Sequence, residues 1–177
     1  MAISDKRVDR LLDLIYDAAT EPGLWRPVLT EIADCTGSQS AALLRQSAPT
    51  GQLHFCYNGR MDEACNRAYA ARHIRNPVAA GMRSRHVGRI ILSDEIVPLA
   101  SLRNTLFFNE VLRPQDIAHT ALVALAAKDE FMTALNLCRS ARQGPLDADG
   151  RGLIEHIVPH ICRSIRLGLR VDGYSAL

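Results

Sequence analysis

Residues 118–140 read AHTALVALAAKDEFMTALNLCRS. Two almost wholly apolar runs, at 119–127 and 131–138, flank a short polar turn made by Lys128, Asp129 and Glu130. Apolar runs of this length on either side of such a turn are typical of a β-hairpin. A hairpin with one solvated face would alternate apolar and polar residues, so near-continuous apolarity indicates that both faces are covered. We therefore expect this hairpin at the centre of a sheet.

The side chains of the hairpin are small for a protein core. Its alanines are Ala121, Ala124, Ala126, Ala127 and Ala134, and its polar members are Thr133, Asn136 and Cys138. Small side chains on a covered strand leave room either for closely packed helices or for a cavity. The sequence therefore predicts helices on one face of the sheet and a pocket on the other.

The composition is that of one ordinary globular domain. The chain has 177 residues, of which 47% are hydrophobic and 23% are charged, and this is enough to build a core. No apolar run of about 18 residues occurs, which excludes a transmembrane helix at the usual threshold, and the N-terminus lacks the apolar stretch of a signal peptide. We expect a cytoplasmic protein without membrane contact. The net charge of +2 is too small to predict nucleic-acid binding.

Metal binding is not predicted. The five cysteines are scattered and form no Cys-x-x-Cys pair, which argues against a disulfide framework and against a thiolate zinc site. His54 and Cys56 share one side of a predicted strand, and His156 and His160 are four residues apart in a predicted helix. Two ligands do not make a metal site. A structural role is therefore expected for each pair, and no cofactor is expected.

The remaining segments alternate between helices and strands. Amphipathic spacing predicts helices at 5–20, 25–35, 62–74 and 102–111, and a last helix that begins near residue 149 and runs to about residue 171. Strands are expected at 40–46, 52–58 and 89–92, a turn or short helix at 77–82, and a loop at 93–95. Strands joined by short turns imply an antiparallel sheet. The fold class is therefore α+β, with a central antiparallel sheet of about five strands and helices packed on its faces.

Two runs resemble the sensory half of bacterial LuxR-type transcriptional regulators. They are LLDLIYDAATEPGLWRPVLTEIAD at 11–34 and IVPHICRSIRLGLR at 157–170. Residues 69–78, which end in Asn76, Pro77 and Val78, are similar to the Asp-Pro segment that lines the pocket of autoinducer-binding modules. Asn76 stands where those modules carry the aspartate that holds the amide of the ligand.

The resemblance implies a GAF-like or PAS-like fold and a sensory function. It implies a single sensory domain over residues 1–171, with 172–177 as a C-terminal tail. In regulators of this type a helix-turn-helix follows the last sensory helix, and this sequence has none. DNA is therefore expected to be a partner only through a helix-turn-helix module absent from this chain.

We expect an unknown small organic ligand to bind between the sheet and the helices at 62–74 and 102–111. The residues predicted to contact it combine aromatic walls with a few polar groups, and they are Tyr57, Tyr69, His73, Phe107, Asn136 and Cys138. The alternative is an interaction module that dimerises and binds nothing small. A homodimer is expected under both hypotheses.

An enzyme is not expected. The sequence has no Gly-x-Ser-x-Gly elbow, phosphate-binding loop, His-Glu-x-x-His motif or dinucleotide-binding glycine pattern. No spacing of carboxylates singles out an acid–base pair. No catalytic residue is therefore assigned.

Overall fold

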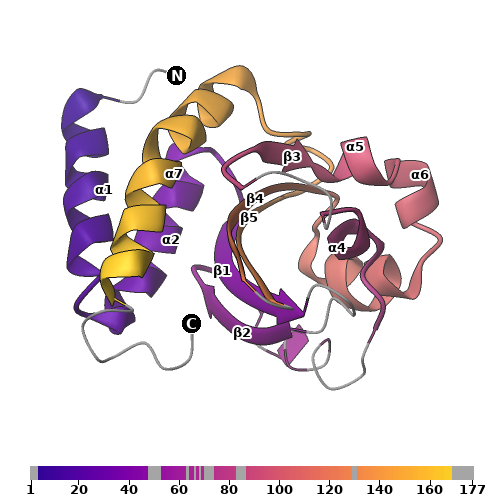
Figure 1. The fold of residues 1–177 in the computed structure, drawn as a ribbon. Coiled ribbons are helices and arrows are strands. Elements are labelled where there is room, and N and C mark those ends of the chain that lie inside the picture. Colours follow the sequence, from indigo (N-terminus) through magenta and orange to yellow (C-terminus); the bar gives the residue numbers. More distant parts are fainter. Residues whose placement is uncertain are drawn as a thin grey trace.

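The computed structural model describes residues 4–47, 53–62, 64, 65, 67, 69, 74–82, 87–128 and 131–168. Helices cover both faces of a central sheet (Figure 1). In chain order the elements are α1 (Asp5–Asp17), η1 (Pro22–Leu24), α2 (Trp25–Cys35), β1 (Ser40–Ser47), β2 (Leu53–Asn58), α4 (Pro77–Met82), β3 (Ile90–Leu92), α5 (Ser93–Ile96), α6 (Leu99–Leu102), η2 (Phe108–Leu112), η3 (Arg113–Gln115), β4 (His119–Lys128), β5 (Phe131–Arg139) and α7 (Ala148–Gly168). No helix in these ranges is long and apolar enough to cross a membrane.

The sheet has five strands in the order β2-β1-β5-β4-β3, and each neighbouring pair is antiparallel. The predicted hairpin is confirmed, because β4 pairs with β5 from His119 opposite Arg139 to Lys128 opposite Phe131. Its second strand, β5, is the middle strand of the sheet. The α+β class, with its central antiparallel sheet, is confirmed with it.

One face of the sheet carries α1, α2 and α7 (Figure 1). The first core lies between these helices and the sheet, and it includes Leu11, Ile15, Trp25, Val28, Leu29, Ile32, Leu43, Leu135, Leu137, Ile154, Ile157 and Ile161. Trp25 is 1% exposed and belongs to this core, so it packs with the helices. Fully burying one such side chain contributes roughly 1.5–3 kcal/mol. The many buried side chains of this face therefore contribute substantially to stability.

Hydrogen bonds hold α7 against α1, including one from Arg163 Nη1 to Tyr16 Oη at 3.3 Å. Ser164 Oγ donates to the Ile15 carbonyl oxygen at 2.6 Å, and Tyr16 Oη lies 2.9 Å from His160 Nδ1. The ring of His160 also meets the edge of the Tyr16 ring, with 5.7 Å between centroids. His160 therefore has a structural partner on α1.

A glycine fixes β2 against α2. A Cβ atom on Gly59 would lie 2.9 Å from the backbone nitrogen of Thr30 and 3.0 Å from the carbonyl carbon of Leu29. Only a residue without a side chain fits this close approach. Because Gly59 faces α2, the preceding residue, Asn58, points away from the first core.

The structure differs from the sequence prediction at two short segments. The loop expected at 93–95 is the helix α5, and Ser93 Oγ accepts a hydrogen bond from the Thr120 N–H at 3.0 Å. The helix expected at 102–111 is broken, because α6 ends at Leu102 and a π-helix begins at Phe108. Thr105 causes the break: its Oγ1 donates to the Leu102 carbonyl at 2.7 Å and accepts from the Phe108 N–H at 3.1 Å.

The predicted helix at 62–74 falls partly outside the described residues. Of its described residues, those at 64, 65, 67 and 69 are helical, whereas those at 62 and 74 are not. Asp62 Oδ1 accepts hydrogen bonds from the N–H groups of Ala64 at 2.7 Å and Cys65 at 3.3 Å. An aspartate therefore caps this segment.

Candidate functional site

The face of the sheet opposite α1, α2 and α7 carries a second core, beneath α4, α5 and α6 (Figure 1). Its buried members come from the sheet, from these short helices and from the π-helix, and they are Tyr69, Val78, Met82, Ile91, Leu102, Phe107, Phe108, Val111, Leu112, Ile117, Leu122, Ala124, Met132, Ala134 and Cys138. The covering helices are short and irregular, whereas those on the first core are long. The second core is therefore the better place for a ligand to enter.

One row of residues crosses the sheet on this face. In register, Asn58 lies opposite Ala42, Ala42 opposite Asn136, Asn136 opposite Leu122, and Leu122 opposite Ile91. Residues directly opposite in antiparallel strands point to the same face. Since Leu122 and Ile91 belong to the second core, the side chains of Asn58 and Asn136 point to it as well.

The two asparagines are unusual members of this row. In the part of the chain that the structure describes, Asn58 Oδ1 and Asn136 Oδ1 are buried and have no hydrogen-bond partner. The Asn136 Nδ2 amide donates to Cys138 Sγ at 3.6 Å, a weak interaction with sulfur. A buried acceptor without a partner costs about 1–3 kcal/mol. The folded chain has two such oxygens on one face of the sheet, so this free-energy cost applies twice.

Tyr69 and Phe107 form an aromatic pair in the second core, across from the sheet. The rings of Tyr69 and Phe107 are 5.4 Å apart between centroids and tilted by 58°. Tyr69 is 8% exposed and Phe107 is 6% exposed. Burial raises the pKa of Tyr69, and a hydrogen bond with the Asn76 side chain partly offsets that rise. The Tyr69 hydroxyl is therefore neutral at physiological pH.

Asn76 has a structural role beside this pair. Its Oδ1 accepts hydrogen bonds from the N–H groups of Val78 at 3.0 Å and Ala79 at 3.1 Å, so it caps the first turn of α4. An amide oxygen has two lone pairs, and both are used here. Asn76 is therefore not arranged to accept a hydrogen bond from a ligand through this oxygen.

The structure brings four of the six predicted ligand-binding residues to this face. Tyr69, Phe107 and Cys138 belong to the second core, and Asn136 points to it from the middle strand. Tyr57 is not with them: it lies opposite Leu43 and packs against the first core. His73 lies outside the described residues.

Asn58 points to this face but is not among the residues predicted from the sequence. Side chains alternate between the faces of a strand, so Asn58 and Tyr57 cannot both face the second core. Tyr57 is predicted from its aromatic ring alone. The register between β1 and β2, which the sequence does not show, selects Asn58 instead.

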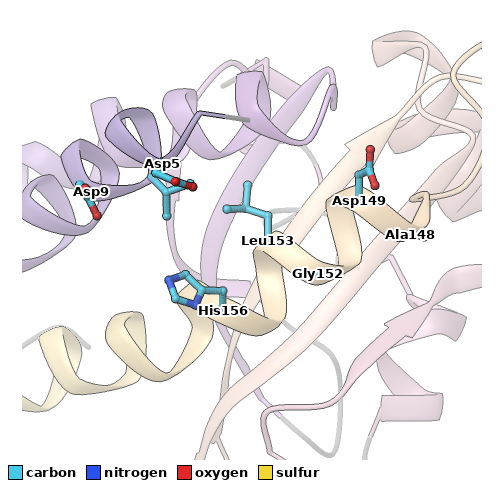
Figure 2. Close-up of a pocket in the computed structure, with 8 residues that line it drawn as sticks. Asp5, Asp9, Ala148, Asp149, Gly152, Leu153 and His156 are labelled. Atoms are coloured by element: carbon cyan, nitrogen blue, oxygen red, sulfur yellow. The ribbon is translucent and has the colours of Figure 1, made fainter. Parts of the chain in front are cut away.

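Two hollows lie elsewhere on the molecule. Figure 2 shows one between α1 and α7, of about 550 Å³, lined by Asp5, Val8, Asp9, Ala148, Asp149, Gly152, Leu153 and His156. Another, of about 480 Å³, is lined by Ser4, Arg7, Asp34, Cys35, Thr36, Gly37, Arg139, Asp147, Asp149 and Gly150. Asp5, Asp9, Asp149 and His156 are exposed, so the first hollow is a solvated groove. Among the described residues, no three His, Cys, Asp or Glu side chains are grouped to hold a metal ion.

No protein-family model and no curated protein sequence matches this chain. Three solved structures of regulatory proteins match its fold. The VqsR ligand-binding domain from Pseudomonas aeruginosa has a TM-score of 0.71 at 16% identity, over 93% of this chain and 98% of that one. SdiA in complex with octanoyl-rac-glycerol has a TM-score of 0.65 at 17% identity, over 100% and 71%. CepR2 of Burkholderia cenocepacia, an N-acylhomoserine lactone-dependent LuxR family factor, has a TM-score of 0.59 at 14% identity, over 95% and 98%.

The predicted GAF-like architecture also has a match. The phycoerythrobilin-bound GAF domain of a cyanobacterial phytochrome has a TM-score of 0.58 at 11% identity, over 98% of this chain and 100% of that one. At these identities the likeness concerns the fold. The chain therefore has the fold that LuxR-type ligand-binding domains share with GAF domains.

Proposed function

We propose that this chain is the small-molecule-sensing domain of a LuxR-type transcriptional regulator. A small organic ligand binds at the second core, between the sheet and the helices that carry Tyr69 and Phe107. Residues 1–171 act as one sensory unit, and α7 relays the binding event to a DNA-binding module outside this chain. A homodimer is the form in which the regulator acts.

The observation that supports this proposal best is the polar content of the second core. It is apolar and aromatic apart from a few groups, and two of these are amide oxygens that are buried without a partner. Small-molecule sites have this composition, since apolar walls provide affinity and a few polar groups fix orientation. The solved structures of this fold include complexes with octanoyl-rac-glycerol and with phycoerythrobilin.

The relay runs through β4 and α7. Leu122 and Ala124 of β4 belong to the second core, whereas Val123 and Leu125 belong to the first core, which α7 covers. Cys162 Sγ of α7 donates to the Leu125 carbonyl at 3.5 Å. A ligand that shifts β4 therefore acts on α7 across the thickness of one sheet. Binding that prefers one position of α7 shifts its population toward that position.

Native mass spectrometry of the purified chain, before and after denaturation, tests the proposal. We expect an added mass of a few hundred daltons that stays with the folded protein and leaves on denaturation. The ligand-free protein should take up the same mass again from a cell extract. A folded protein that carries and takes up no added mass would favour the interaction module and contradict ligand sensing.

A further inference from the structure

We infer that the ligand is a neutral amphiphile that donates at least two hydrogen bonds, one to Asn58 Oδ1 and one to Asn136 Oδ1. The inference rests on the proposed function and names the chemical class of its ligand. The ligand has an apolar body, and its O–H or N–H groups are the donors. Recognition by Asn76 through its side-chain oxygen has no part in this arrangement.

The two unpaired oxygens carry a free-energy cost that a ligand can remove. Most buried side-chain oxygens in proteins have a hydrogen-bond partner, and each exception needs an explanation. Here two exceptions lie on one face and in one register row, separated only by Ala42. A ligand that supplies both donors removes both costs when it binds. A ligand with acceptors only would leave them in place.

Both asparagines are partly accessible. Asn136 lies on the middle strand of a sheet covered on both faces, yet its side chain is partly exposed, and so is that of Asn58. Part of each residue is therefore accessible, although the two oxygens themselves are buried. The terminal torsion of asparagine is broad, so the amide can turn and present its oxygen to a ligand. The turned amide gives up the weak contact between its Nδ2 and Cys138 Sγ. In its place, Asn136 Oδ1 accepts a hydrogen bond from the ligand.

The charge of the surrounding residues and the distance between the two asparagines limit the chemistry of the ligand. The described neighbours of the two asparagines on this face are all uncharged, and they are Ala42, Leu44, Leu122, Ala134 and Cys138. A charged ligand would find no counter-charge among these five residues, and burying it beside them is costly. Strands are about 4.8 Å apart, so the two Cα atoms are separated by about 10 Å. The donors of the ligand therefore lie within about 10 Å of each other.

The test uses the whole chain, two variants and two matched probes. Asn58→Leu and Asn136→Leu replace each amide by an apolar side chain of similar size. The probes are 1-octanoyl-rac-glycerol, which has two hydroxyl donors, and its dimethyl ether, which keeps the oxygens but donates nothing. Thermal unfolding and isothermal titration are measured for the wild type and for each variant.

We expect the diol to bind the wild type and the ether to bind at least about tenfold more weakly, since each lost donor leaves an amide oxygen unpaired. Each variant should bind the diol about tenfold more weakly than the wild type and lose much of the preference over the ether. Without probe, each variant should unfold at a temperature no lower than the wild type, because an unpaired oxygen has been removed. Replacing a residue that has a purely structural role would lower the stability of the protein. Weaker binding together with unchanged or higher stability therefore indicates a role in binding.

Three results would overturn the inference. They are equal affinity for the diol and the ether, a clear loss of stability in both ligand-free variants, and no binding of the diol to the wild type. In each case an added mass in native mass spectrometry would leave the proposed sensing function standing. Loss of both the added mass and probe binding would remove the proposed function itself.

Discussion

Phenylalanine at position 136 is expected to block the ligand site while the protein stays folded. The Asn136 side chain is partly exposed on a covered middle strand, so the larger ring fills the adjoining space and removes the unpaired oxygen. A ligand that must then share this space faces an overpacking cost of about 1–3 kcal/mol, which weakens binding roughly 5- to 150-fold. The added mass in native mass spectrometry should fall accordingly, with the unfolding temperature unchanged or higher.

The matched control is Thr133→Phe. Thr133 is on the same strand and is also partly exposed, but it alternates with Ala134 of the second core and so points to the other face. This variant should retain the ligand at the wild-type level. If both variants lose the ligand equally, or if Asn136→Phe unfolds the protein, the second core is solid and the site lies elsewhere.

Methionine at position 139 is expected to destabilise the folded chain by about 3 kcal/mol. Arg139 is 6% exposed. Its guanidinium donates to the carbonyls of Gly144 at 2.8 Å, Thr36 at 2.8 Å and Gln143 at 3.2 Å. Hydrogen bonds from a charged donor contribute about 1.5–3 kcal/mol each and are not additive. Methionine fills similar space but leaves these carbonyls without their donor.

The measurement for Arg139→Met is denaturant unfolding of the purified chain. Arg142→Met, at an exposed position nearby, should stay within about 0.5 kcal/mol of the wild type. Lysine at position 139 should recover only part of the loss, because it lacks the planar fork that reaches several acceptors. If Arg139→Met is as stable as the wild type, the hydrogen bonds of Arg139 do not hold the turn between β5 and α7. That turn leads directly from Asn136 and Cys138 into α7, so its rigidity also matters for the relay.

The long elements could be predicted from the sequence because their signals are local. The apolar runs around Lys128 give the hairpin, and the α2 helix has the predicted bounds of Trp25–Cys35. The helix α5 has only four residues, which is too short for an amphipathic pattern, so its acidic residues predict a loop instead. The break at Thr105 depends on one hydroxyl that bonds to two backbone groups. Composition does not reveal such a bond.

The candidate site was predictable only in part, for a related reason. Tyr69 and Phe107 are aromatic, and Asn136 and Cys138 are polar groups in an apolar strand, so each has a signal of its own. Whether Tyr57 or Asn58 faces the same side as Asn136 depends on the register between β1 and β2. Register depends on long-range pairing. The aromatic ring of Tyr57 is a signal for a binding residue, but Tyr57 lies on the other face of the sheet from this group of residues.

Hydrogen–deuterium exchange tests the central claim most directly, with the ligand-bound chain compared with the same chain refolded without its ligand. We predict slower exchange of the bound form in β1, in β5, in residues 99–115 and in α7, because the ligand orders the second core and β4 transmits the change to α7. Protection confined to α1 and the first turns of α7, around the groove in Figure 2, would place the ligand at the other side of the molecule. That result, or no difference between the two forms, would contradict a ligand site at the second core.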